Sequence, residues 1–444
     1  EPLARIYAIP DHLHALTHMI GDGLVPSNAK AGYLARMLAR RILRMRDDLG
    51  IDVTLAELIS HHIDVNMEGH NMKQTRDGII TIMSLEEERY GEVLRKGTNL
   101  INQSLKSIAQ DAEQLPDELL FQLNDSHGLP PDMVINMAQA IGWSQLRLRT
   151  GFSAELAERH AKMAKAAASA DQHTSYVHEL PQLPKTVPLY YNDVHQRSFD
   201  ASVLASIPLV EGVAPESATH AIVLSESCFY PEGGGQEGDY GSLTTDGTSR
   251  QVLDTKKENG LILHLCDGPF EVGDLVHGSI DWSRRKQLMD HHTAVHIVGG
   301  AARRILGPHI YQAGSNKSSE LARLDVTHYR RLTREDLDAI EVLSNEVLGQ
   351  VSRIEKIVLP RHEADKKYGF DLYQGGAPKG NEIRVLRISD HDVQACGGTH
   401  HDEPGKIGSI RVVRSTAVQD GVERLHIVAG DSALSFAREQ GEIL

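Results

Sequence analysis

Apolar residues change their spacing near residue 188, and this change divides the chain into two parts. Before that point they recur every three or four positions, which is the period of amphipathic helices. The clearest example lies between residues 32 and 49, where one face would carry Leu34, Leu38, Ile42, Met45 and Leu49. The Ala-rich segment 152–170 is also helix-prone. The sequence therefore predicts a mainly helical region over residues 1–177.

Three arginines in the first of these helices, Arg36, Arg40 and Arg44, repeat at intervals of four residues. We expect them on the face opposite the apolar one. Such a face is ordinarily solvated. Like charges at this spacing repel each other, however, so an anionic partner such as RNA phosphate would relieve the repulsion. The pattern alone leaves both interpretations open.

A proline-rich segment separates the two parts of the chain. Residues 178–188 contain three prolines, at 181, 184 and 188, and we expect a linker here. From residue 189 to residue 281, short apolar runs alternate with turns rich in Gly and Asp, including the long turn Glu232–Gly241. This pattern is typical of a small antiparallel barrel or sandwich.

Residues 282–430 have a mixed pattern that fits an α+β domain. A long helix is expected over residues 284–306, ended by Gly307-Pro308, and a second one begins after Thr333, with Asp336 three residues on as its capping partner. Strands are expected near residues 321–327, 382–389, 409–415 and 423–429. Residues 431–444 look like the start of a further helix. The predicted fold class is therefore multidomain: a helical region, a small β-barrel and an α+β domain.

Composition narrows the class of protein. No run approaches the roughly 20 apolar residues that span a bilayer, and no signal peptide is visible, so we expect a cytoplasmic protein with no membrane partner. Three cysteines make no disulfide framework and suit a reducing compartment. Cys228 and Cys266 lie in strand-like runs, where we expect buried structural thiols. Because the chain begins at Glu1 rather than Met, we expect it to be part of a longer protein.

The formal net charge of −15 argues against a general polyanion binder, whose affinity comes from Lys and Arg that neutralise phosphates. A local basic patch stays compatible with this average.

Two short motifs carry candidate metal chemistry. His292 and His296 stand four residues apart in the predicted helix, so both can chelate one ion from the same face. Cys396 and His400 have the same spacing, but Gly397-Gly398 between them favours a loop that can wrap an ion. Together they supply the four N and S ligands of a tetrahedral site, and zinc suits such ligands.

Two neighbouring positions sharpen this prediction. Helical angles place His291 among Leu288, Val295 and Val298, so we expect a structural histidine there. Position 293 is Thr, whereas zinc peptidases of the His-Glu-x-x-His type carry a Glu after the first His as their general base. A metallopeptidase is therefore not expected.

These motifs, taken in order, resemble the editing domain of alanyl-tRNA synthetases and their free-standing trans-editing relatives. The resemblance extends to nearly the whole chain and to the archaeal type of synthetase. It is carried by Asp22–Asn28 with Gly32–Arg36, Leu123–Pro131, Phe229–Gly241, His292–His296, Gln312–Ser315, Arg323–Asp325 and Cys396–His400. The family then implies that residues 1–177 recognise tRNA, and that the barrel and a zinc-binding α+β domain together form the editing domain.

The resemblance assigns roles to individual residues. It implies that Asn28 and Asp125 read a G·U pair in the acceptor stem of tRNA(Ala), and that the row of arginines at 36, 40 and 44 contacts the phosphate backbone. From the residues alone, a helix N-cap at Asn28 and a turn residue at Asp125 are the favoured interpretations; with the resemblance, recognition is favoured. Gln236 resembles a residue proposed to line the editing pocket, and a hairpin-loop amide is an equally good interpretation.

The implied activity is hydrolysis of mischarged Ser-tRNA(Ala) and Gly-tRNA(Ala). A site that accepts alanine cannot strongly reject glycine or serine, so a second, hydrolytic site is the physical remedy. Two positions depart from the family: Val295 replaces the usual Thr that is thought to bind the serine hydroxyl, and Lys30-Ala31 replaces Gly-Arg. Either Thr293 or another donor compensates for Val295, or the chain discriminates serine less well.

Parts of the family's whole enzyme are not recognisable in this sequence. The class II aminoacylation domain, which uses ATP and Mg²⁺, is missing, so this chain should not activate alanine. The C-terminal domain, through which the whole enzyme could form a dimer, is missing as well. The alternative to an editing enzyme is a non-catalytic RNA-binding protein in which Zn²⁺ is only structural, and four protein ligands would suit such a closed site.

Overall fold

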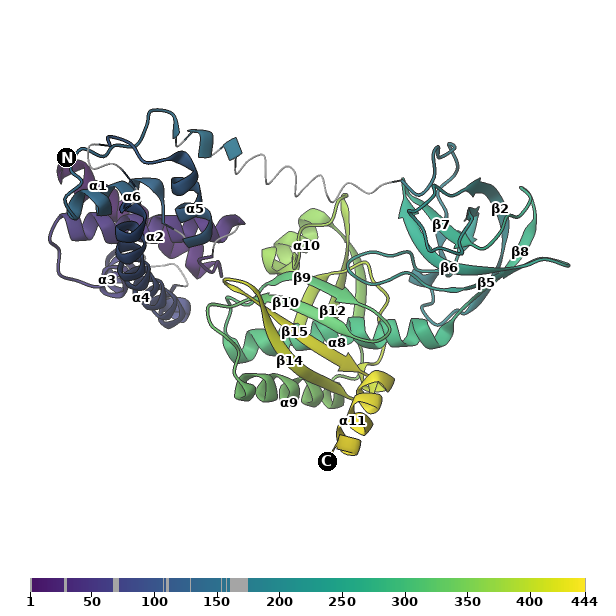
Figure 1. The fold of residues 1–444 in the computed structure, drawn as a ribbon. Coiled ribbons are helices and arrows are strands. Elements are labelled where there is room, and N and C mark those ends of the chain that lie inside the picture. Colours follow the sequence, from purple (N-terminus) through teal and green to yellow (C-terminus); the bar gives the residue numbers. More distant parts are fainter. Residues whose placement is uncertain are drawn as a thin grey trace. The chain divides into compact units, whose positions relative to one another are not determined.

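The computed structural model describes residues 2–27, 30–66, 72–106, 108, 112–127, 129–152, 154–156, 158–159 and 175–443. The chain forms two compact units, which we call unit 1 (Glu1–His173) and unit 2 (Thr174–Leu444) (Figure 1). In the described part of the chain, no helix is long and apolar enough to cross a lipid bilayer.

Unit 1 is helical in its described residues, which confirms the prediction for this region. Helix α1 packs against α2 and α3, and the long helix α4 packs against α2, α3 and α6. Most of the Ala-rich segment 152–170 lies outside the described residues. The described helices are α1 (Pro2–Gly21), α2 (Lys30–Asp48), α3 (Leu55–Asn66), α4 (Met72–Leu105), α5 (Asp117–His127) and α6 (Pro131–Ala140).

Helix α2 buries only part of the face that its apolar spacing predicted. Ile42 and Met45 of that face are buried, but Leu34 is 45% exposed, although the pattern placed it in the core. The other fully buried side chains lie on an adjacent side of the helix and are Ala35, Ala39 and Leu43. The small alanines allow close helix packing, so the buried face is shifted toward them.

The arginine row is correspondingly not a solvated face. Arg36 is 5% exposed because its Nε donates to Glu86 Oε1 of α4 at 3.0 Å. Arg40 Nε donates to the same oxygen at 3.2 Å, and Arg44 pairs with Asp132 of α6. Ion pairs within unit 1 therefore relieve the repulsion for which an anionic partner was one of the two interpretations, and the solvated face is wrong for Arg36.

Unit 2 begins with the expected barrel, which is closed rather than a sandwich. Its strand order is β2-β3-β7-β6-β5-β8, with antiparallel neighbours. Phe199, Phe229 and Val276 are among the side chains that fill it. Two short parallel strands, β1 (Val187–Pro188) and β4 (Glu226–Ser227), and the 3-10 turn η1 (Leu189–Tyr191) precede or flank it. The barrel strands are β2 (Ser198–Pro208), β3 (His220–Leu224), β5 (Gly241–Thr244), β6 (Ser249–Glu258), β7 (Leu261–Cys266) and β8 (Leu275–Ile280).

The α+β part contains two antiparallel sheets, with orders β14-β15-β10-β9 and β11-β12-β13. Helices α8 and α9 pack along one face of the four-stranded sheet (Figure 1), over a core of side chains such as Val298, Leu324 and Leu425. The elements are α8 (Trp282–Leu306), β9 (Gln312–Lys317), β10 (Ala322–Thr327), α9 (Arg334–Gln350), β11 (Glu355–Pro360), α10 (Arg361–Tyr368), η2 (Phe370–Leu372), β12 (Glu382–Ile388), β13 (Asp392–Ala395), η3 (Pro404–Ile407), β14 (Ile410–Gln419), β15 (Val422–Ala429) and α11 (Asp431–Ile443).

The helix ends follow the signals in the sequence. Helix α8 begins after Asp281, whose side chain caps it by accepting from Arg284 N, and it ends at Gly307 with φ 118°. Helix α9 has the expected capping box of Thr333 and Asp336. Strands β9, β11 and β13 and helix α10 were not predicted.

A buried ion pair fixes the barrel to α8. Arg285 is fully buried, and its Nε donates to Asp239 of the glycine-rich turn at 3.0 Å while its Nη2 donates to Cys228 O at 2.7 Å. Asp239 Oδ2 also accepts from Tyr230 N at 2.6 Å. The turn that carries Gln236 is therefore held against the first turns of the helix that carries His292 and His296.

We expect Arg36→Met to destabilise unit 1 by about 3 kcal/mol, because it leaves the buried Glu86 carboxylate with a weakened set of partners. The matched control is Arg41→Met, since Arg41 is exposed on the same helix. Urea denaturation can be followed by Trp143 fluorescence in a Trp282→Phe background, so that only unit 1 is observed. Equal free energies of unfolding for the two variants would contradict the prediction.

Candidate metal centre

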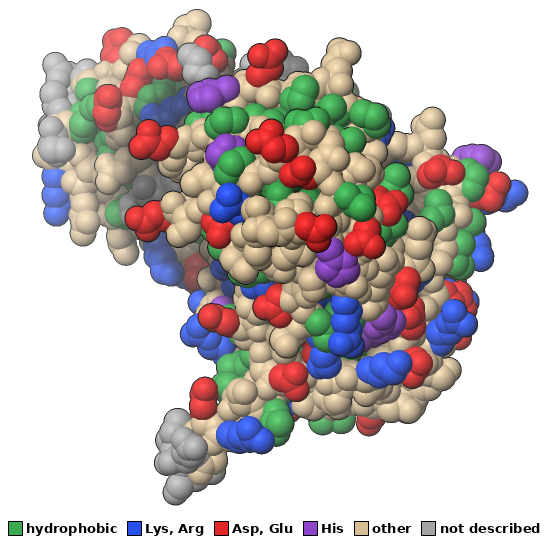
Figure 2. Space-filling view, turned by 90° about the vertical axis from the view of Figure 1, so that its right-hand side faces the viewer, with side chains coloured by type: hydrophobic (Ala, Val, Ile, Leu, Met, Phe, Trp, Pro, Cys, Tyr) green, Lys and Arg blue, Asp and Glu red, His purple; other side chains and the backbone are tan. Residues whose placement is uncertain are grey.

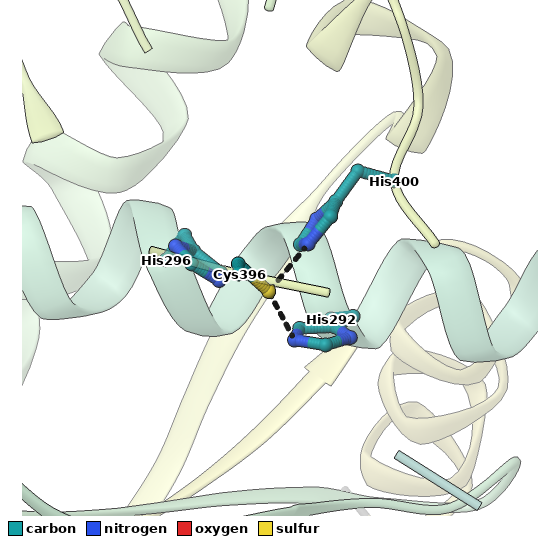
Figure 3. A group of neighbouring side chains, drawn as sticks. All are labelled: His292, His296, Cys396 and His400. Atoms are coloured by element: carbon teal, nitrogen blue, oxygen red, sulfur yellow. Dashed lines mark hydrogen bonds between the residues drawn. The ribbon is translucent and has the colours of Figure 1, made fainter. Parts of the chain in front are cut away.

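Four side chains converge at one point of unit 2. His292 and His296 extend from successive turns of α8, and Cys396 and His400 come from the loop after β13 (Figure 3). Their ligand atoms all lie within 4.8 Å of one another. The two half-sites that are about a hundred residues apart in the sequence therefore form one cluster.

The spacing of these atoms fits a tetrahedral ion. Cys396 Sγ lies 3.2 Å from His400 Nε2 and 3.5 Å from His292 Nε2. Ligands at the zinc distances of about 2.0–2.1 Å for nitrogen and about 2.3 Å for sulfur would be about 3.3–3.6 Å apart. His292, His296 and His400 are at most 4% exposed, so the three imidazoles are shielded from water.

Each histidine of the cluster is held by an oxygen on its far side. His292 Nδ1 lies 2.7 Å from Gln236 Oε1, His400 Nδ1 lies 3.2 Å from Thr293 Oγ1, and His296 Nδ1 lies 3.4 Å from an oxygen of Asp392. An Nδ1–H that donates to an oxygen leaves the Nε2 lone pair for an ion. This outer set of acceptors is what a metal-binding triad of histidines requires, and it fits zinc.

Electrostatics favour the thiolate form of Cys396. Burial alone would raise the pKa of the thiol, but the surrounding His292, His400 and His296 lower it well below its usual value. Burial lowers the pKa of His292 to about 4, which keeps its imidazole neutral. Burial also opposes the charge on His296, but the thiolate and Asp392 raise its pKa to about 9. A thiolate and neutral imidazoles are the metal-binding forms, and an ion would take the place of the proton on His296.

The glycine-rich turn of the barrel delivers Gln236 to this cluster. Gly235 has φ 73°, and a Cβ there would lie 2.2 Å from Ser315 O of β9, so only glycine permits the close approach. Lys317 N donates to Gly235 O at 2.6 Å, and Glu237 N donates to Lys317 O at 3.1 Å. The turn is thus docked on β9, and Gln236 points inward.

Gln236 connects the first histidine to the cysteine loop. Its Oε1 accepts from His292 Nδ1 and, at 3.2 Å, from Thr399 N, while its Nε2 donates to Thr399 Oγ1 at 2.8 Å. The side chain is fully buried. Its proposed place as a lining residue of the editing pocket stays a prediction; in the structure it supports a metal ligand.

Thr293 and Val295 lie on two sides of the same helix. Thr293 is fully buried, and its hydroxyl is engaged with His400. Val295 is 2% exposed and belongs to the apolar core of the α+β part. It also lines a cavity of about 10 Å³ together with Gln312 and Gln394, which is close to the smallest volume that holds one water molecule.

Three residues that we expected to have only structural roles, His291, Cys228 and Cys266, lie outside the metal cluster. His291 is fully buried outside the cluster, with its Nδ1 2.7 Å from Ser318 O and its Nε2 3.1 Å from Gln287. Cys228 and Cys266 are free and fully buried. Burial raises the pKa of the Cys228 thiol to about 12, so it stays protonated.

The candidate tRNA contacts lie in unit 1, apart from this cluster in the sequence. Asn28 is outside the described residues. Asp125 lies within α5 rather than in a turn, and its side chain is outside the described part of the chain. The assignment of Asn28, Asp125 and the arginine row to tRNA binding stays a prediction. Acidic and basic side chains are interspersed on the face that Figure 2 shows.

Several residues of the site were not found from the sequence. Asp392 lies four residues before Cys396, but a single sequence does not show whether this spacing is conserved, so nothing marked Asp392 as a partner of His296. Arg384, Lys356 and Tyr191 bind the backbone of the cysteine loop from β12, β11 and η1. No local motif marks them, since their role depends on strand pairing far from the loop in sequence.

Two family models match the chain. The model of tRNA synthetases class II (A) matches residues 2–284, and the model of the threonyl and alanyl tRNA synthetase second additional domain matches residues 383–426. The second match contains both ligands of the cysteine loop. These matches place the chain among the class II aminoacyl-tRNA synthetases.

Similar proteins narrow the assignment to one family of synthetases. Alanine–tRNA ligases of Pyrococcus furiosus and Thermococcus kodakarensis are each 41% identical over 448 residues, which span 100% of this chain and 47% of the relative. That of Halobacterium salinarum is 43% identical over 444 residues, which span 46% of the relative. The chain therefore belongs to the alanyl-tRNA synthetase family, which confirms the resemblance of the motifs. It spans about half the length of the curated relatives it matches.

We expect His292→Ala to remove most bound zinc and His291→Ala to leave it in place, because His292 Nε2 lies beside Cys396 Sγ whereas both ring nitrogens of His291 face Ser318 and Gln287. The metal content of the purified variants, measured after dialysis against a weak chelator, decides this. Equal zinc loss in both variants would show that helix α8 as a whole, rather than the named ligand, controls metal binding.

Gly398→Ala should weaken zinc binding about 10- to 100-fold, as do changes in the residues that orient metal ligands. A Cβ at Gly398 would lie 2.1 Å from His292 Cε1 and 3.2 Å from Gln236 Oε1. Gly397→Ala is the control, because a Cβ there meets only Tyr191 Oη, at 3.4 Å. Chelator competition gives both dissociation constants, and similar values for the two variants would contradict the predicted close packing.

Proposed function

We propose that unit 2 hydrolyses the ester bond of mischarged tRNA(Ala), and that unit 1 recognises this tRNA. The convergence of His292, His296, Cys396 and His400 beneath the barrel is the observation that carries the proposal. The match of the second additional domain and the similarity to alanine–tRNA ligases support it. The substrates would be Ser-tRNA(Ala) and Gly-tRNA(Ala).

The proposed reaction breaks one bond and forms one. Water adds its oxygen to the acyl carbon of the amino acid, the acyl C–O bond to the terminal ribose breaks, and a proton goes to the ribose oxygen. Zn²⁺ held by the four ligands would supply Lewis-acid polarisation of the ester carbonyl, for which a fifth ligand position or ligand exchange is needed. ATP and Mg²⁺ belong to aminoacylation and have no part in this step.

The residues of the chain would act by orientation. Gln236, Thr293 and Asp392 hold the three imidazoles from behind, so their Nε2 atoms stay directed at one point. The packing of the glycine-rich turn over the cluster excludes water from the ligands' far side. A preorganised site of this kind does not have to reorganise when charge develops on the ester oxygen.

Val295 bears on the choice between the two substrates. Serine differs from alanine by one hydroxyl, and a valine side chain offers no hydrogen bond to it. The Thr293 hydroxyl is engaged with His400. We therefore propose that this chain hydrolyses Ser-tRNA(Ala) and Gly-tRNA(Ala) at more similar rates than a chain with Thr at position 295.

The experiment mixes the purified chain with Ser-tRNA(Ala), and in parallel with Gly-tRNA(Ala) and Ala-tRNA(Ala), and times deacylation. We expect hydrolysis of the first two at about 100-fold or more above the spontaneous rate, and Cys396→Ala should abolish it. If no zinc-dependent hydrolysis exceeds background although the metal is bound, the editing proposal fails. The site would then be a structural zinc site of an RNA-binding protein, which its four protein ligands also suit.

A further inference from the structure

The backbone carbonyls of the loop that joins Cys396 to His400 face side-chain donors from three other elements. Arg384 Nη1 of β12 donates to Cys396 O at 2.7 Å and to Gly398 O at 3.0 Å. Tyr191 Oη of η1 donates to Gly397 O at 2.9 Å. Lys356 Nζ of β11 donates to His400 O at 2.8 Å. Four of the five carbonyls of the loop are thus bound from outside it.

Arg384 binds Cys396 through two groups. Its main-chain oxygen accepts from Cys396 N at 3.0 Å, while its guanidinium donates to Cys396 O. The guanidinium also lies over the ring of Tyr191, at 5.2 Å from the centroid. Arg384 therefore fixes the peptide groups on both sides of the Cys396 Cα atom and stacks on the second residue that holds the loop.

The charge of Arg384 is not used in an ion pair among the described residues. Other basic residues of β11 and β12 do form ion pairs: Lys356 pairs with Asp402, and Arg387 pairs with Glu355 and Asp390. None of the ion pairs of the described residues involves Arg384, which is half-buried. A partly desolvated cation without a carboxylate has a free-energy cost. Here the loop carbonyls and the aromatic ring offset it.

The loop needs such restraint because of its sequence. Gly397 and Gly398 lose more conformational entropy on ordering than other residues would. Gly398 cannot be replaced by a stiffer residue, since a Cβ would meet His292. Inside the loop, Gly398 N lies 3.4 Å from Cys396 Sγ and Thr399 N donates to Gln236. The amides of Gly398 and Thr399 are thus used on the side of the cluster, and the carbonyls of the three residues 396–398 on the side of Arg384 and Tyr191.

We propose that Arg384 is a positioning residue of the metal centre and that Tyr191 is a second one. By binding the carbonyls of Cys396 and Gly398, Arg384 holds the loop in the conformation in which Cys396 Sγ and His400 Nε2 converge. The inference rests on the proposed function in one respect, namely that these two atoms bind the metal ion. It does not require that the ion hydrolyse an ester.

The test compares Arg384→Met, Arg384→Lys and Tyr191→Phe with Arg387→Met as the matched control on the same strand. Two readouts need no tRNA: the zinc dissociation constant from chelator competition, and the absorption spectrum of the cobalt(II)-substituted chain, whose thiolate-to-cobalt band reports on Cys396. We expect zinc binding about 10- to 100-fold weaker and a changed band for Arg384→Met.

The conservative variants separate positioning from general stability. Arg384→Lys should retain part of the affinity, because the ammonium keeps a charged donor for the carbonyls but lacks the planar group that lies over the ring of Tyr191. Tyr191→Phe should show a smaller loss, since one bond is removed. Arg387→Met should stay within about twofold of the wild type, as expected for an exposed ion pair. If metal-free Arg384→Met does not fold by circular dichroism, Arg384→Lys and Tyr191→Phe decide.

The inference would be overturned if Arg384→Met had unchanged zinc affinity and an unchanged cobalt spectrum. The same result in both conservative variants would overturn it too, and so would a wild-type chain that binds neither zinc nor cobalt.

The outcome of this test is separable from that of the editing assay. A chain that deacylates Ser-tRNA(Ala) with a metal centre indifferent to Arg384 would retain the proposed function and lose this inference. A chain whose zinc affinity depends on Arg384 but which does not deacylate would do the reverse.

Discussion

A single buried amide, that of Gln236, connects the three segments from which the metal centre is built. It accepts from His292 of α8 and from Thr399 of the cysteine loop, and it is itself carried by the glycine-rich turn of the barrel. Removal of one partner from such a buried network leaves the others unsatisfied, which costs more than the lost bond. The barrel and the α+β part therefore depend on each other through this contact and through the buried Arg285–Asp239 pair. Neither part alone could hold His292 in its observed orientation.

The contacts that order the ligands also bear on the proposed chemical role of a site whose four ligand positions are filled by protein side chains. Three oxygens behind the imidazoles and three donors outside the cysteine loop fix the ligands from both sides. A metal ion bound there would meet ligands that are already ordered, so little of its binding free energy would be spent on folding the loop. This arrangement is compatible with the ester hydrolysis that we propose. Val295, which we propose affects the substrate selectivity, lies in the apolar core and not among the ligands, so Val at this position is compatible with an intact metal centre.

The sequence predicted the order of the parts and the four ligands, because those signals are local. The i, i+4 spacing of His292 and His296, the glycines beside Cys396 and the capping box of Thr333 each act within a few residues. The prediction failed where contacts between residues far apart in the sequence determine which side chains are buried. The apolar spacing of α2 did not reveal that Glu86, about fifty residues away, would draw Arg36 into the core. Arg384 and Tyr191 were missed for the same reason, since their hydrogen bonds depend on which strands and turns lie beside the cysteine loop.

One thiolate and three imidazoles are expected to bind a single ion in unit 2. Zinc K-edge X-ray absorption of the purified wild-type chain measures this directly. We expect one equivalent of zinc with one sulfur at about 2.3 Å and three nitrogens at about 2.0–2.1 Å. We also expect that the sulfur shell disappears in Cys396→Ala. A zinc ion surrounded only by nitrogen and oxygen, or a sulfur shell that survives in Cys396→Ala, would contradict this expectation.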